Sequence, residues 1–333
     1  MQIEIEKLKA LLSPDKKYLI VSHKSPDGDA VGSAVGWFHF LKTFSKHVQI
    51  VLPDPPSDSL SSFLMGSDCC FFNVSPIPSK EYFSQAEVLF CLDFNGPSRV
   101  GSEMESSIKD FKGVSCMIDH HPEPESFTNV SISDVQNSST CQLLFECIQE
   151  MGMGDRISVD CAKALYLGIM TDTGSFRFPS VTAKTHLALA FLLEKGLRAS
   201  DVHEQLSDNN RLDQLKLRGY ATYEKIAMHS KYPLGLITLS KAELDRFNYQ
   251  PGDTDGLVNA ILSIKGIKMA ILLQEKSDGV KISFRSKGEI EINQFAKKHF
   301  NGGGHKYASG GISYDSMQET VRKINNHIAE VFA

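Results

Sequence analysis

The chain has 333 residues, of which 41% are hydrophobic and 23% charged, with a formal net charge of −5, a balance typical of a globular protein of about two domains. No apolar run approaches the ~20 residues of a membrane helix, no secretory signal is visible at the charged N-terminus, and the modest charge argues against tight binding to long nucleic acid. The seven cysteines show neither a disulfide framework nor the spacing of a zinc site, so we expect reduced thiols, buried at Cys91 and Cys116, in a cytoplasmic protein.

The first part of the chain alternates predicted strands with predicted helices. Four apolar runs rich in Val, Ile and Leu predict buried strands at 17–23, 47–53, 87–93 and 113–119. Helical patterns lie at 30–44, 103–111, 139–151, 159–171 and 183–195. This alternation predicts a parallel sheet with helices on both faces, in which ligands bind beyond the carboxyl ends of the strands. The small residues Gly32 and Gly36 would let the first of these helices approach the sheet closely.

The second part of the chain follows a polar, helix-like stretch at 200–228, which we interpret as a connector. Strands are predicted at 232–240, 268–275, 280–286 and 307–314. Helices are predicted at roughly 254–264, 291–299 and 316–331. The predicted organisation is therefore a first domain over 1–195, a helical connector over 196–228 and a second domain over 229–333.

The charge is divided unevenly between the two parts. Residues 1–215 carry 18 Lys and Arg against 28 Asp and Glu, a net charge of −10, whereas residues 216–333 carry 17 against 12, a net charge of +5. An acidic first part could hold cations, and a mildly basic second part could hold an anionic substrate. Solvated surfaces without any ligand would give the same asymmetry, so charge alone leaves both interpretations open.

Acidic and histidine side chains recur where the elements of the first part end. They are Asp27 and Asp29 after the first strand, Asp93 after the third, the triplet Asp119, His120 and His121 after the fourth, and Asp172 at a helix end. Each position alone is more often a helix cap than a metal ligand. Together they would gather several carboxylates at one edge of the sheet, where divalent cations would neutralise their repulsion.

The ligand types indicate which ions fit this cluster. Carboxylate and imidazole groups without thiolates suit manganese, magnesium or iron and argue against structural zinc. The number of ligands suits two ions about 3.5–4 Å apart, an arrangement that clamps the attacking and leaving oxygens of a phosphoryl transfer. A water shared by the two ions would become a hydroxide nucleophile near neutral pH, so no covalent enzyme intermediate is required.

Several segments resemble the motifs of a known superfamily in order and spacing. SHKSPDGDAVGS at 22–33, LDF at 92–94, DHH at 119–121 and MTDTG at 170–174 resemble the motifs of the DHH phosphoesterase superfamily. NGGGHKYASGG at 301–311 resembles the signature of the accessory domain called DHHA1. The resemblance covers nearly the whole chain and is closest to the two-domain branch of NrnA-like nano-RNases, which are oligoribonucleases and phosphatases of 3′-phosphoadenosine 5′-phosphate (pAp).

This resemblance implies an architecture and a metal centre. The fold class would be α/β, with a parallel-sheet DHH domain joined by the helical connector to a smaller mixed α/β DHHA1 domain, and the active site in the cleft between them. Two divalent ions, most often Mn²⁺ with Mg²⁺ as another candidate, would be held by residues of the first domain. One ion would be bound by His23, Asp27 and Asp93, and the other by Asp29, Asp93, His120 and Asp172, with Asp93 bridging.

The resemblance also implies roles for the neighbouring residues. Asp119 would orient an imidazole, and His121 would face the substrate phosphate, stabilising charge or passing a proton to the leaving oxygen; a structural histidine remains an alternative. Arg99 is a candidate phosphate contact. In the second domain, the predicted substrate contacts are Arg285, Ser286, Gly302, Gly303, Gly304 and His305.

The glycine triplet carries an independent physical argument. Three glycines can turn successive backbone N–H groups toward one point, a nest suited to phosphate or carboxylate oxygens. A plain tight turn between helix and strand would use the same residues. Aromatic side chains give a weaker signal: core packing explains Trp37 and Phe38 better than base stacking does, and the roles of Phe176 and Phe178 stay open.

The predicted function is therefore metal-dependent hydrolysis of short RNA or DNA oligonucleotides to mononucleotides and removal of the 3′-phosphate of pAp. The same chemistry could instead cleave a cyclic dinucleotide, its linear product or inorganic polyphosphate. A non-catalytic nucleotide- or RNA-binding regulator is the alternative from another class. We expect no membrane partner, no long nucleic acid, and a monomer or homodimer.

Overall fold

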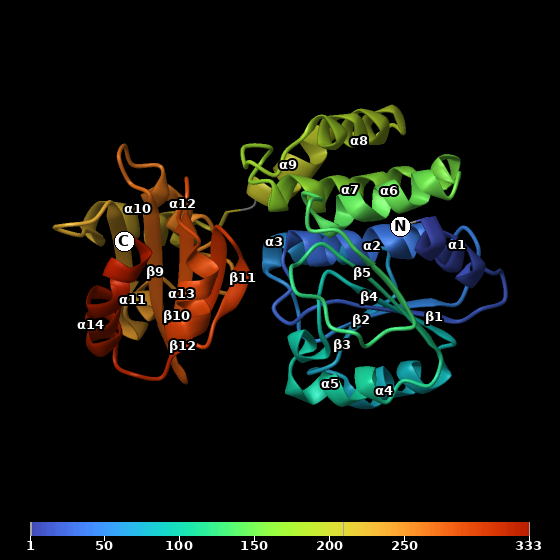
Figure 1. Cartoon of the computed structure of the whole chain (residues 1–333), viewed down its shortest axis with the longest axis horizontal. Helices are drawn as coiled ribbons and strands as arrows, with labels where there is room; N and C mark the ends of the chain where they lie inside the picture. Colours follow the sequence, from blue (N-terminus) through green and yellow to red (C-terminus); the bar gives the residue numbers. More distant parts are fainter. Residues whose placement is uncertain (1, 209, 333) are drawn as a thin grey trace. The chain divides into compact units, whose positions relative to one another are not determined.

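The computed structural model describes residues 2–208 and 210–332, with the backbone alone at His305. The chain divides into two compact units, Met1–Asn209 and Asn210–Ala333, each of which contains a sheet covered by helices (Figure 1). Among the described residues, no helix has both the length and the apolar character needed to cross a membrane.

The first unit is built on a six-stranded parallel sheet of order β3-β2-β1-β4-β5-β6. The strands are β1 (Tyr18–Val21), β2 (Val48–Leu52), β3 (Cys69–Phe71), β4 (Val88–Leu92), β5 (Val114–Asp119) and β6 (Val130–Ser133). Strand order runs outward in opposite directions from β1 and β4, which are neighbours in the sheet. Their carboxyl ends therefore form the topological switch point at which α/β sheets bind ligands.

Helices cover both faces of this sheet, as predicted (Figure 1). The helices of this unit are α1 (Gln2–Leu11), α2 (Gly28–Leu41), α3 (Asp58–Ser61), α4 (Pro76–Gln85), α5 (Ser102–Lys109), α6 (Thr140–Glu150), α7 (Val159–Asp172), α8 (Ala183–Glu194) and α9 (Ala199–Ser207), with short 3₁₀ turns η1 (Ser62–Leu64), η2 (Pro97–Val100) and η3 (Gly154–Arg156). Successive strand residues alternate between the faces. Ile20 packs under α2, α6 and α7, whereas Leu19 and Val21 pack on the side of α4 and α5.

The four predicted strands and five predicted helices of this unit are present, but the sheet has two further strands at its edges. β3 is three residues long and only half-buried, and β6 alternates buried and exposed residues. Neither forms an apolar run long enough to be recognised. The stretch at 200–228 contains two helices, α9 and α10 (Leu212–Glu224), which belong to different units.

The closest helix contact of the first unit joins α2 to α7. A Cβ atom on Gly32 would lie 2.6 Å from the carbonyl oxygen of Ala164 and 2.9 Å from the nitrogen of Gly168, both in the backbone of α7. Gly36 meets Leu165 of the same helix. The expectation that these small residues face the sheet is therefore wrong: they let two helix backbones touch.

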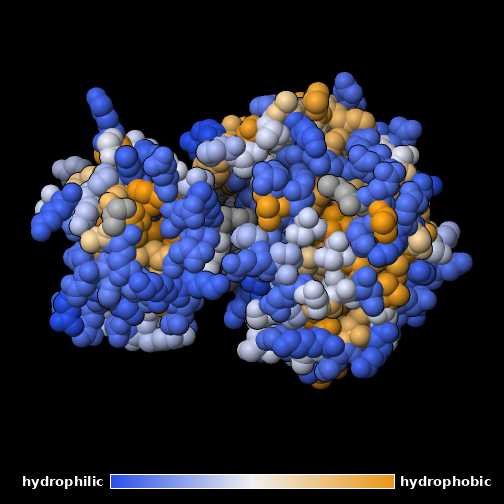
Figure 2. All heavy atoms as spheres, in the orientation of Figure 1, coloured by the Kyte–Doolittle hydropathy of each residue, from blue (hydrophilic) through white to orange (hydrophobic). Residues whose placement is uncertain are grey.

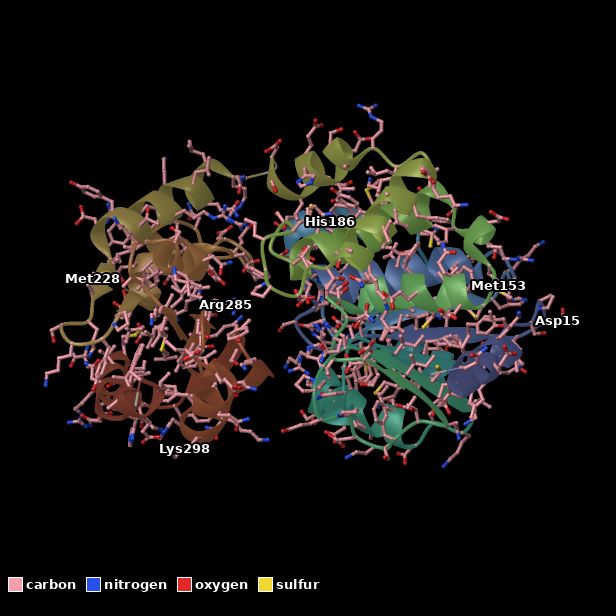
Figure 3. All side chains as sticks on the ribbon, turned by 45° about the horizontal axis from the view of Figure 1, so that its top comes forward. Asp15, Met153, His186, Met228, Arg285 and Lys298 are labelled. Atoms are coloured by element: carbon pink, nitrogen blue, oxygen red, sulfur yellow. The ribbon has the colours of Figure 1, made fainter. Side chains whose placement is uncertain are left out.

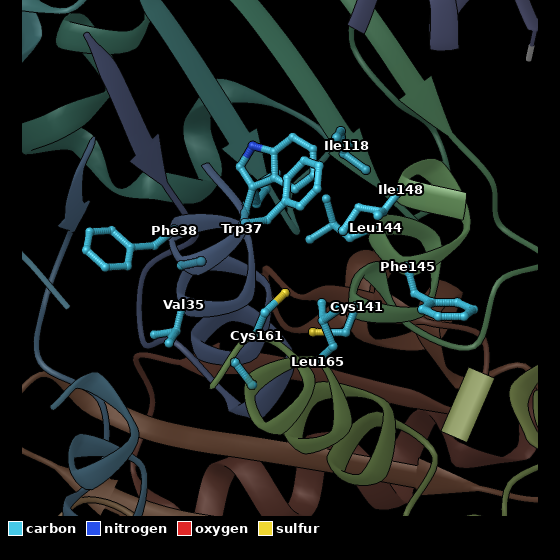
Figure 4. Close-up of a cluster of buried hydrophobic side chains, with 14 of the residues drawn as sticks. Val35, Trp37, Phe38, Ile118, Cys141, Leu144, Phe145, Ile148, Cys161 and Leu165 are labelled. Carbon is cyan, nitrogen blue, oxygen red and sulfur yellow. The ribbon is translucent and has the colours of Figure 1, made fainter. Parts of the chain in front are cut away.

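The aromatic residues of α2 belong to the core, as predicted. Trp37, Phe38 and Phe40 are at most 2% exposed, and the indole of Trp37 meets Phe90 of β4 edge-on at 5.3 Å. Figure 4 shows how side chains of α2, α6 and α7 meet in this cluster. Phe176 packs against the same core, which answers part of the open question about the aromatic pair.

The cysteines are free thiols throughout the part of the chain that the structure describes. Cys91 and Cys116 lie on central strands and are fully buried. Burial raises the pKa of both thiols well above the ordinary value, which disfavours the reactive thiolate. The prediction of buried thiols at these two positions is confirmed.

The second unit contains a mixed sheet of order β11-β12-β10-β9-β8-β7, in which only the β8–β9 pair is parallel among the described strands. The strands are β7 (Ile226–Met228), β8 (Leu234–Leu239), β9 (Met269–Lys276), β10 (Gly279–Ser286), β11 (Gly303–His305) and β12 (Ala308–Ser313). α10, α11 (Lys241–Arg246) and α12 (Leu257–Leu262) cover one face, and α13 (Ile292–His299), α14 (Met317–His327) and η4 (Ile328–Val331) cover the other. The mixed α/β fold is confirmed.

The surface of the molecule is mainly polar on the face shown in Figure 2, where hydrophilic residues predominate and apolar ones form smaller patches. Within the second unit, a partly buried network links helix α11 to the end of α10. Glu243 accepts hydrogen bonds at 2.6 Å from both Lys225 and Tyr220, and at 2.8 Å from the backbone N–H of Ser240. Although burial alone would raise the pKa of Glu243, the bonds from Lys225, Tyr220 and Ser240 lower it to about 2.

Gly32→Ala is expected to lower the free energy of unfolding by roughly 1–3 kcal/mol, because a methyl group must push the backbones of α2 and α7 apart. The measurement is urea unfolding followed by circular dichroism. Gly219→Ala is the matched control, because Gly219 lies inside α10 with open space around it, and alanine there is expected to stabilise by about 0.5–1 kcal/mol. A Gly32→Ala protein as stable as wild type would contradict the close contact.

Glu243→Gln is expected to lower the free energy of unfolding by about 1–2 kcal/mol at pH 7, a value discounted for partial exposure of the carboxylate. Because the pKa of Glu243 is lowered on folding, its contribution is present above the ordinary value of 4.5 and is lost as the pH falls toward 2. Urea unfolding at pH 7 and pH 3 should therefore show a smaller difference at pH 3. Glu319→Gln, at the corresponding cap position of α14, is the exposed control.

Candidate active site

The predicted cluster lies at the switch point of the first unit. His23 follows β1 after one residue, Asp93 directly follows β4, and Asp119 ends β5. Asp93 has a φ angle of +65°, in the left-handed region that aspartate tolerates better than most residues. This local backbone conformation turns the chain at the strand end, and Asp93 is 1% exposed.

His23, Asp27 and Asp93 form the first group that could hold a metal ion. Nε2 of His23 lies 3.4 Å from Oδ2 of Asp93 and 3.8 Å from Oδ1 of Asp27. Asp27 also caps α2, because its carboxylate accepts the backbone N–H groups of Asp29 and Ala30. The sequence signal for an ordinary helix cap and the signal for a metal ligand therefore come from the same residue.

Asp29, His120 and Asp172 form the second group. Nε2 of His120 lies 3.5 Å from Oδ2 of Asp172, 3.7 Å from Oδ2 of Asp29 and 3.8 Å from Oδ1 of Asp93. Its Nδ1 lies 3.3 Å from the carbonyl oxygen of Asn137, a contact that orients the ring. Asp172 is the last residue of α7, so the packing of this helix positions it.

Asp93 belongs to the first group and also to a third one, which it forms with His120 and His121. Oδ2 faces His23, and Oδ1 lies 3.8 Å from Nε2 of His120 and 3.7 Å from Nδ1 of His121. Asp119 lies behind His121, with Oδ1 2.7 Å from Nδ1 of that imidazole. The second oxygen of Asp119 is buried and has no hydrogen-bond partner among the described residues.

The carboxylates of the cluster repel one another. Burial, together with the charges of Asp93 and Asp172, raises the pKa of Asp29 well above its ordinary value. The backbone N–H groups of Thr140 and Cys141, at the start of α6, donate to its two oxygens at 2.7 and 3.0 Å. The N-terminus of a helix stabilises negative charge, and here it offsets only part of the repulsion.

The imidazoles differ in their response to these charges. Burial alone would lower the pKa of His23 and of His121, but the carboxylates beside them raise both above the ordinary value. Burial is the stronger effect at His120 and lowers its pKa. A neutral His120 offers a lone pair to a cation, as a metal ligand must.

The donor set fits divalent cations. The groups contain four carboxylates and three imidazoles and no thiolate, the ligand types that manganese and magnesium accept. Burial first, and then the charges of neighbouring carboxylates, raise the pKa of Asp29, and a bound cation would favour its charged form. His23, Asp27 and Asp93 would hold one ion, and Asp29, Asp93, His120 and Asp172 the other.

Sequence analysis missed the side chains and backbone groups that support these ligands. The hydroxyl of Thr140 donates to Oδ1 of Asp93 at 2.9 Å in the buried interior. Thr140 and Cys141 also supply the N–H groups that bind Asp29. The signal available was the run of Ser138, Ser139 and Thr140, which is typical of a helix start, but a cap sequence does not say which carboxylate it will meet.

Arg99 lies in the first unit on η2, close enough to His121 for its charge to lower the pKa of that imidazole. Its Nε is buried and has no hydrogen-bond partner within the described chain. Arg99 also fixes the loop after β1, because its carbonyl oxygen accepts from the N–H of Lys24 at 2.8 Å. An arginine with an unsatisfied donor beside the cluster suits an anionic ligand.

The residues of the second unit that were predicted to contact substrate differ in their surroundings. Arg285, labelled in Figure 3, is half-buried on β10, and its Nη1 donates to the carbonyl oxygen of Phe284 at 2.9 Å. Ser286 is 5% exposed, and its hydroxyl donates to the carbonyl oxygen of Ile290 at 2.7 Å. The hydroxyl of Ser286 therefore already donates its hydrogen bond within its own domain, which disfavours the predicted contact with substrate.

The glycine triplet leads into an edge strand. The N–H of Gly302 donates to the carbonyl oxygen of Ala296, and Gly303 and Gly304 belong to β11, which pairs with β12. Gly304 has a φ angle of +131°, so the backbone is not regularly extended there. The anion-binding role of the triplet stays a prediction. The prediction for the side chain of His305 lies outside the described residues.

Comparison with known proteins assigns both units to families. The DHH family, N-terminal domain, matches residues 17–169, and the DHHA1 domain matches residues 236–333. The bifunctional oligoribonuclease and PAP phosphatase NrnA of Bacillus subtilis is 30% identical over 88% of this chain and 88% of its own length. The NrnA of Thermus thermophilus is 29% identical over 96% of this chain and 92% of its own length.

A solved structure is also similar over the full length. An exopolyphosphatase-related protein from Bacteroides fragilis is 35% identical and has a TM-score of 0.93, covering 99% of this chain and 96% of that one. The similarity to this structure extends over nearly the whole chain and so includes both sheets. The chain is therefore a hydrolase of the DHH phosphoesterase family, with a DHH domain followed by a DHHA1 domain.

Proposed function

We propose that this protein hydrolyses short oligonucleotides to mononucleotides and removes the 3′-phosphate of pAp, with two divalent metal ions, Mn²⁺ or Mg²⁺. The observation that carries the proposal is the pair of carboxylate–imidazole groups that share Asp93 at the switch point of the sheet. The names of the two NrnA relatives support the choice of substrates. The metal ions, when bound, would lower the pKa of a water and neutralise phosphoryl oxygens.

The chain's own residues would hold and orient the reacting groups. Asp93, the shared ligand, would fix the spacing of the two ions through its two oxygens. Thr140 would keep that carboxylate in one orientation by donating to Oδ1. Asn137 would orient His120 through its carbonyl oxygen. Such supporting contacts commonly set ligand geometry in metal sites.

His121, oriented by Asp119, would supply a proton to the leaving group. The short contact between Oδ1 of Asp119 and Nδ1 of His121 fixes the imidazole ring. The carboxylates also raise the pKa of His121 despite its burial, which favours the protonated imidazole. It could then donate that proton to the leaving oxygen.

Arginine side chains would bind the phosphates. Arg99 has an unsatisfied donor beside the acidic cluster, and Arg285 lies on a central strand of the DHHA1 domain. The net positive charge of residues 216–333 favours a nucleotide rather than a neutral ligand. The absence of strong positive charge over the whole chain favours short substrates over long strands.

One other substrate has a specific observation in its favour. The Bacteroides fragilis relative is described as exopolyphosphatase-related, so polyphosphate is the second candidate on the same chemistry. Cyclic dinucleotides and a non-catalytic binding role stay as hypotheses that the same assays can test. A cytoplasmic location and a monomeric or dimeric state also stay predictions.

Wild-type protein is expected to hydrolyse pAp and oligonucleotides of a few residues with Mn²⁺, with activity fading as length increases and vanishing in EDTA. The assay panel would contain pAp, RNA and DNA oligomers from two to about twenty nucleotides, cyclic di-AMP, pyrophosphate and polyphosphate. Activity confined to polyphosphate or cyclic di-AMP would keep the chemistry and replace the substrate. Binding of nucleotides without turnover of any compound would favour a binding protein.

Asp93→Ala is expected to reduce hydrolysis by more than ~10²-fold, beyond the 10–100-fold typical of losing a group that only orients a ligand. The measurement is kcat at saturating Mn²⁺, with circular dichroism to check the fold. Asp155→Ala, at a fully exposed position of the same domain, is the matched control and should retain wild-type turnover. Near-wild-type turnover in Asp93→Ala would refute the shared-ligand assignment.

Arg285→Ala is expected to raise KM for pAp by roughly 10- to 100-fold with little change in kcat, because a charged hydrogen bond to the bound phosphate is lost. Steady-state kinetics with the exposed-arginine variant Arg322→Ala as control would measure it. If KM does not move, Arg285 has been assigned to the wrong role.

A further inference from the structure

The DHHA1 domain holds a separate group of metal-binding side chains that the proposed hydrolysis does not use. His299 ends α13, His327 ends α14, and Glu330 lies in η4. One ligand atom from each of these residues lies within 4.8 Å of the other two. We propose that His299, His327 and Glu330 bind a divalent transition-metal ion such as Zn²⁺.

The distances between the ligand atoms suit a tetrahedral ion. Nε2 of His299 lies 3.2 Å from Oε2 of Glu330, and Nδ1 of His327 lies 3.2 Å from Oε1 of the same carboxylate. Bonds of about 2.0–2.1 Å at tetrahedral angles separate neighbouring ligands by roughly 3.3 Å. The ion would replace two histidine–carboxylate contacts by three metal bonds once the imidazoles, which contact different oxygens of Glu330, turn toward one point.

Packing holds these side chains in place before any ion arrives. The side chain of His299 is only 8% exposed and lies against Phe295, with ring centroids 4.9 Å apart. The rings of His299 and His327 are stacked at 4.3 Å. His327 and Glu330 are three residues apart, a spacing that places them on one side of a helical turn. Such preorganisation reduces the entropy lost on binding.

The donor chemistry selects a different ion from that of the acidic cluster. Two imidazoles and one carboxylate without a thiolate suit zinc, copper or nickel. Three protein ligands leave a fourth position for solvent. Because His327 is 41% exposed and Glu330 is 43% exposed, the ion can reach the site from water.

A lysine competes for the same carboxylate. Nζ of Lys298, a side chain labelled in Figure 3, lies 2.7 Å from Oε2 of Glu330. Bonds from Lys298, His299 and His327 lower the pKa of Glu330 to about 2, so the carboxylate is charged at neutral pH. An ion-pair cluster without any metal is therefore the alternative explanation. The two explanations differ in what removal of Lys298 should do to metal affinity.

Metal binding at this position would also have a structural consequence. The ligands come from the end of α13, the end of α14 and the turn that follows it, so one ion would tie three segments of the domain together. An ion that binds only the folded domain stabilises it in proportion to the logarithm of its concentration over Kd. Added Zn²⁺ should therefore raise the midpoint of thermal unfolding of the DHHA1 domain.

Equilibrium dialysis of the full chain against Zn²⁺ tests the proposal. His327→Gln and Glu330→Gln are each expected to bind about one equivalent of Zn²⁺ fewer than wild type. His47→Gln, an exposed histidine of the other domain, is the control and should bind as many equivalents as wild type. The acidic cluster takes up ions in every variant, so the difference between variants is the measured quantity.

Lys298→Ala supplies a test of opposite sign. If a metal site exists, loss of the competing ammonium group is expected to tighten Zn²⁺ binding several-fold. An ion-pair cluster alone predicts no such gain. Wild-type stoichiometry and Kd in both His327→Gln and Glu330→Gln would overturn the proposal, as would unchanged or weaker Zn²⁺ binding in Lys298→Ala. Circular dichroism of each variant checks the fold, and dialysis does not depend on whether the protein hydrolyses any substrate.

Discussion

The arrangement of the catalytic domain depends on three helices approaching without intervening side chains. A Cβ atom on Gly168 of α7 would lie 2.1 Å from Sγ of Cys141 on α6 and 2.6 Å from a carboxylate oxygen of Asp29 on α2. Gly32 makes the corresponding close contact on α2. Because α7 ends at Asp172, one turn beyond Gly168, this contact determines whether Asp172 can reach His120. A larger residue at either glycine would move a metal ligand as well as a helix.

The N-termini of two helices then help to determine how much negative charge the acidic cluster can hold. The start of α6 donates two N–H groups to Asp29, and the start of α2 is capped by Asp27. Both arrangements use the partial positive charge of a helix N-terminus. Even with these donors, burial and the charges of Asp93 and Asp172 keep the pKa of Asp29 raised. The fold thus brings anions together more closely than its own backbone can neutralise, which is the condition under which a protein binds cations.

Sequence patterns were sufficient to locate site residues that follow the ends of predicted strands. They were insufficient to locate residues that reach the site only through tertiary contacts. Asp93 and the triplet that begins at Asp119 could be placed because the carboxyl ends of parallel strands share one edge. Thr140 could not be found, since only the packed α6 brings its hydroxyl to Asp93. The glycine triplet predicts a nest or a turn, whereas the structure places Gly303 and Gly304 in the edge strand β11, which pairs with β12. The preference of glycine for unusual conformations does not distinguish these arrangements.

The two candidate metal-binding groups of the chain differ in burial and in ligand type. In the DHH domain, carboxylates predominate and are mostly buried, an environment that suits hard ions able to bind phosphate oxygens. In the DHHA1 domain, imidazoles outnumber carboxylates, and two of the three ligands face solvent. Softer ions prefer such nitrogen-rich sites, so the group in the DHHA1 domain would favour Zn²⁺ over Mn²⁺ or Mg²⁺ more strongly than the acidic cluster does. The ligand set and the supply of each metal would together determine which ion each group binds.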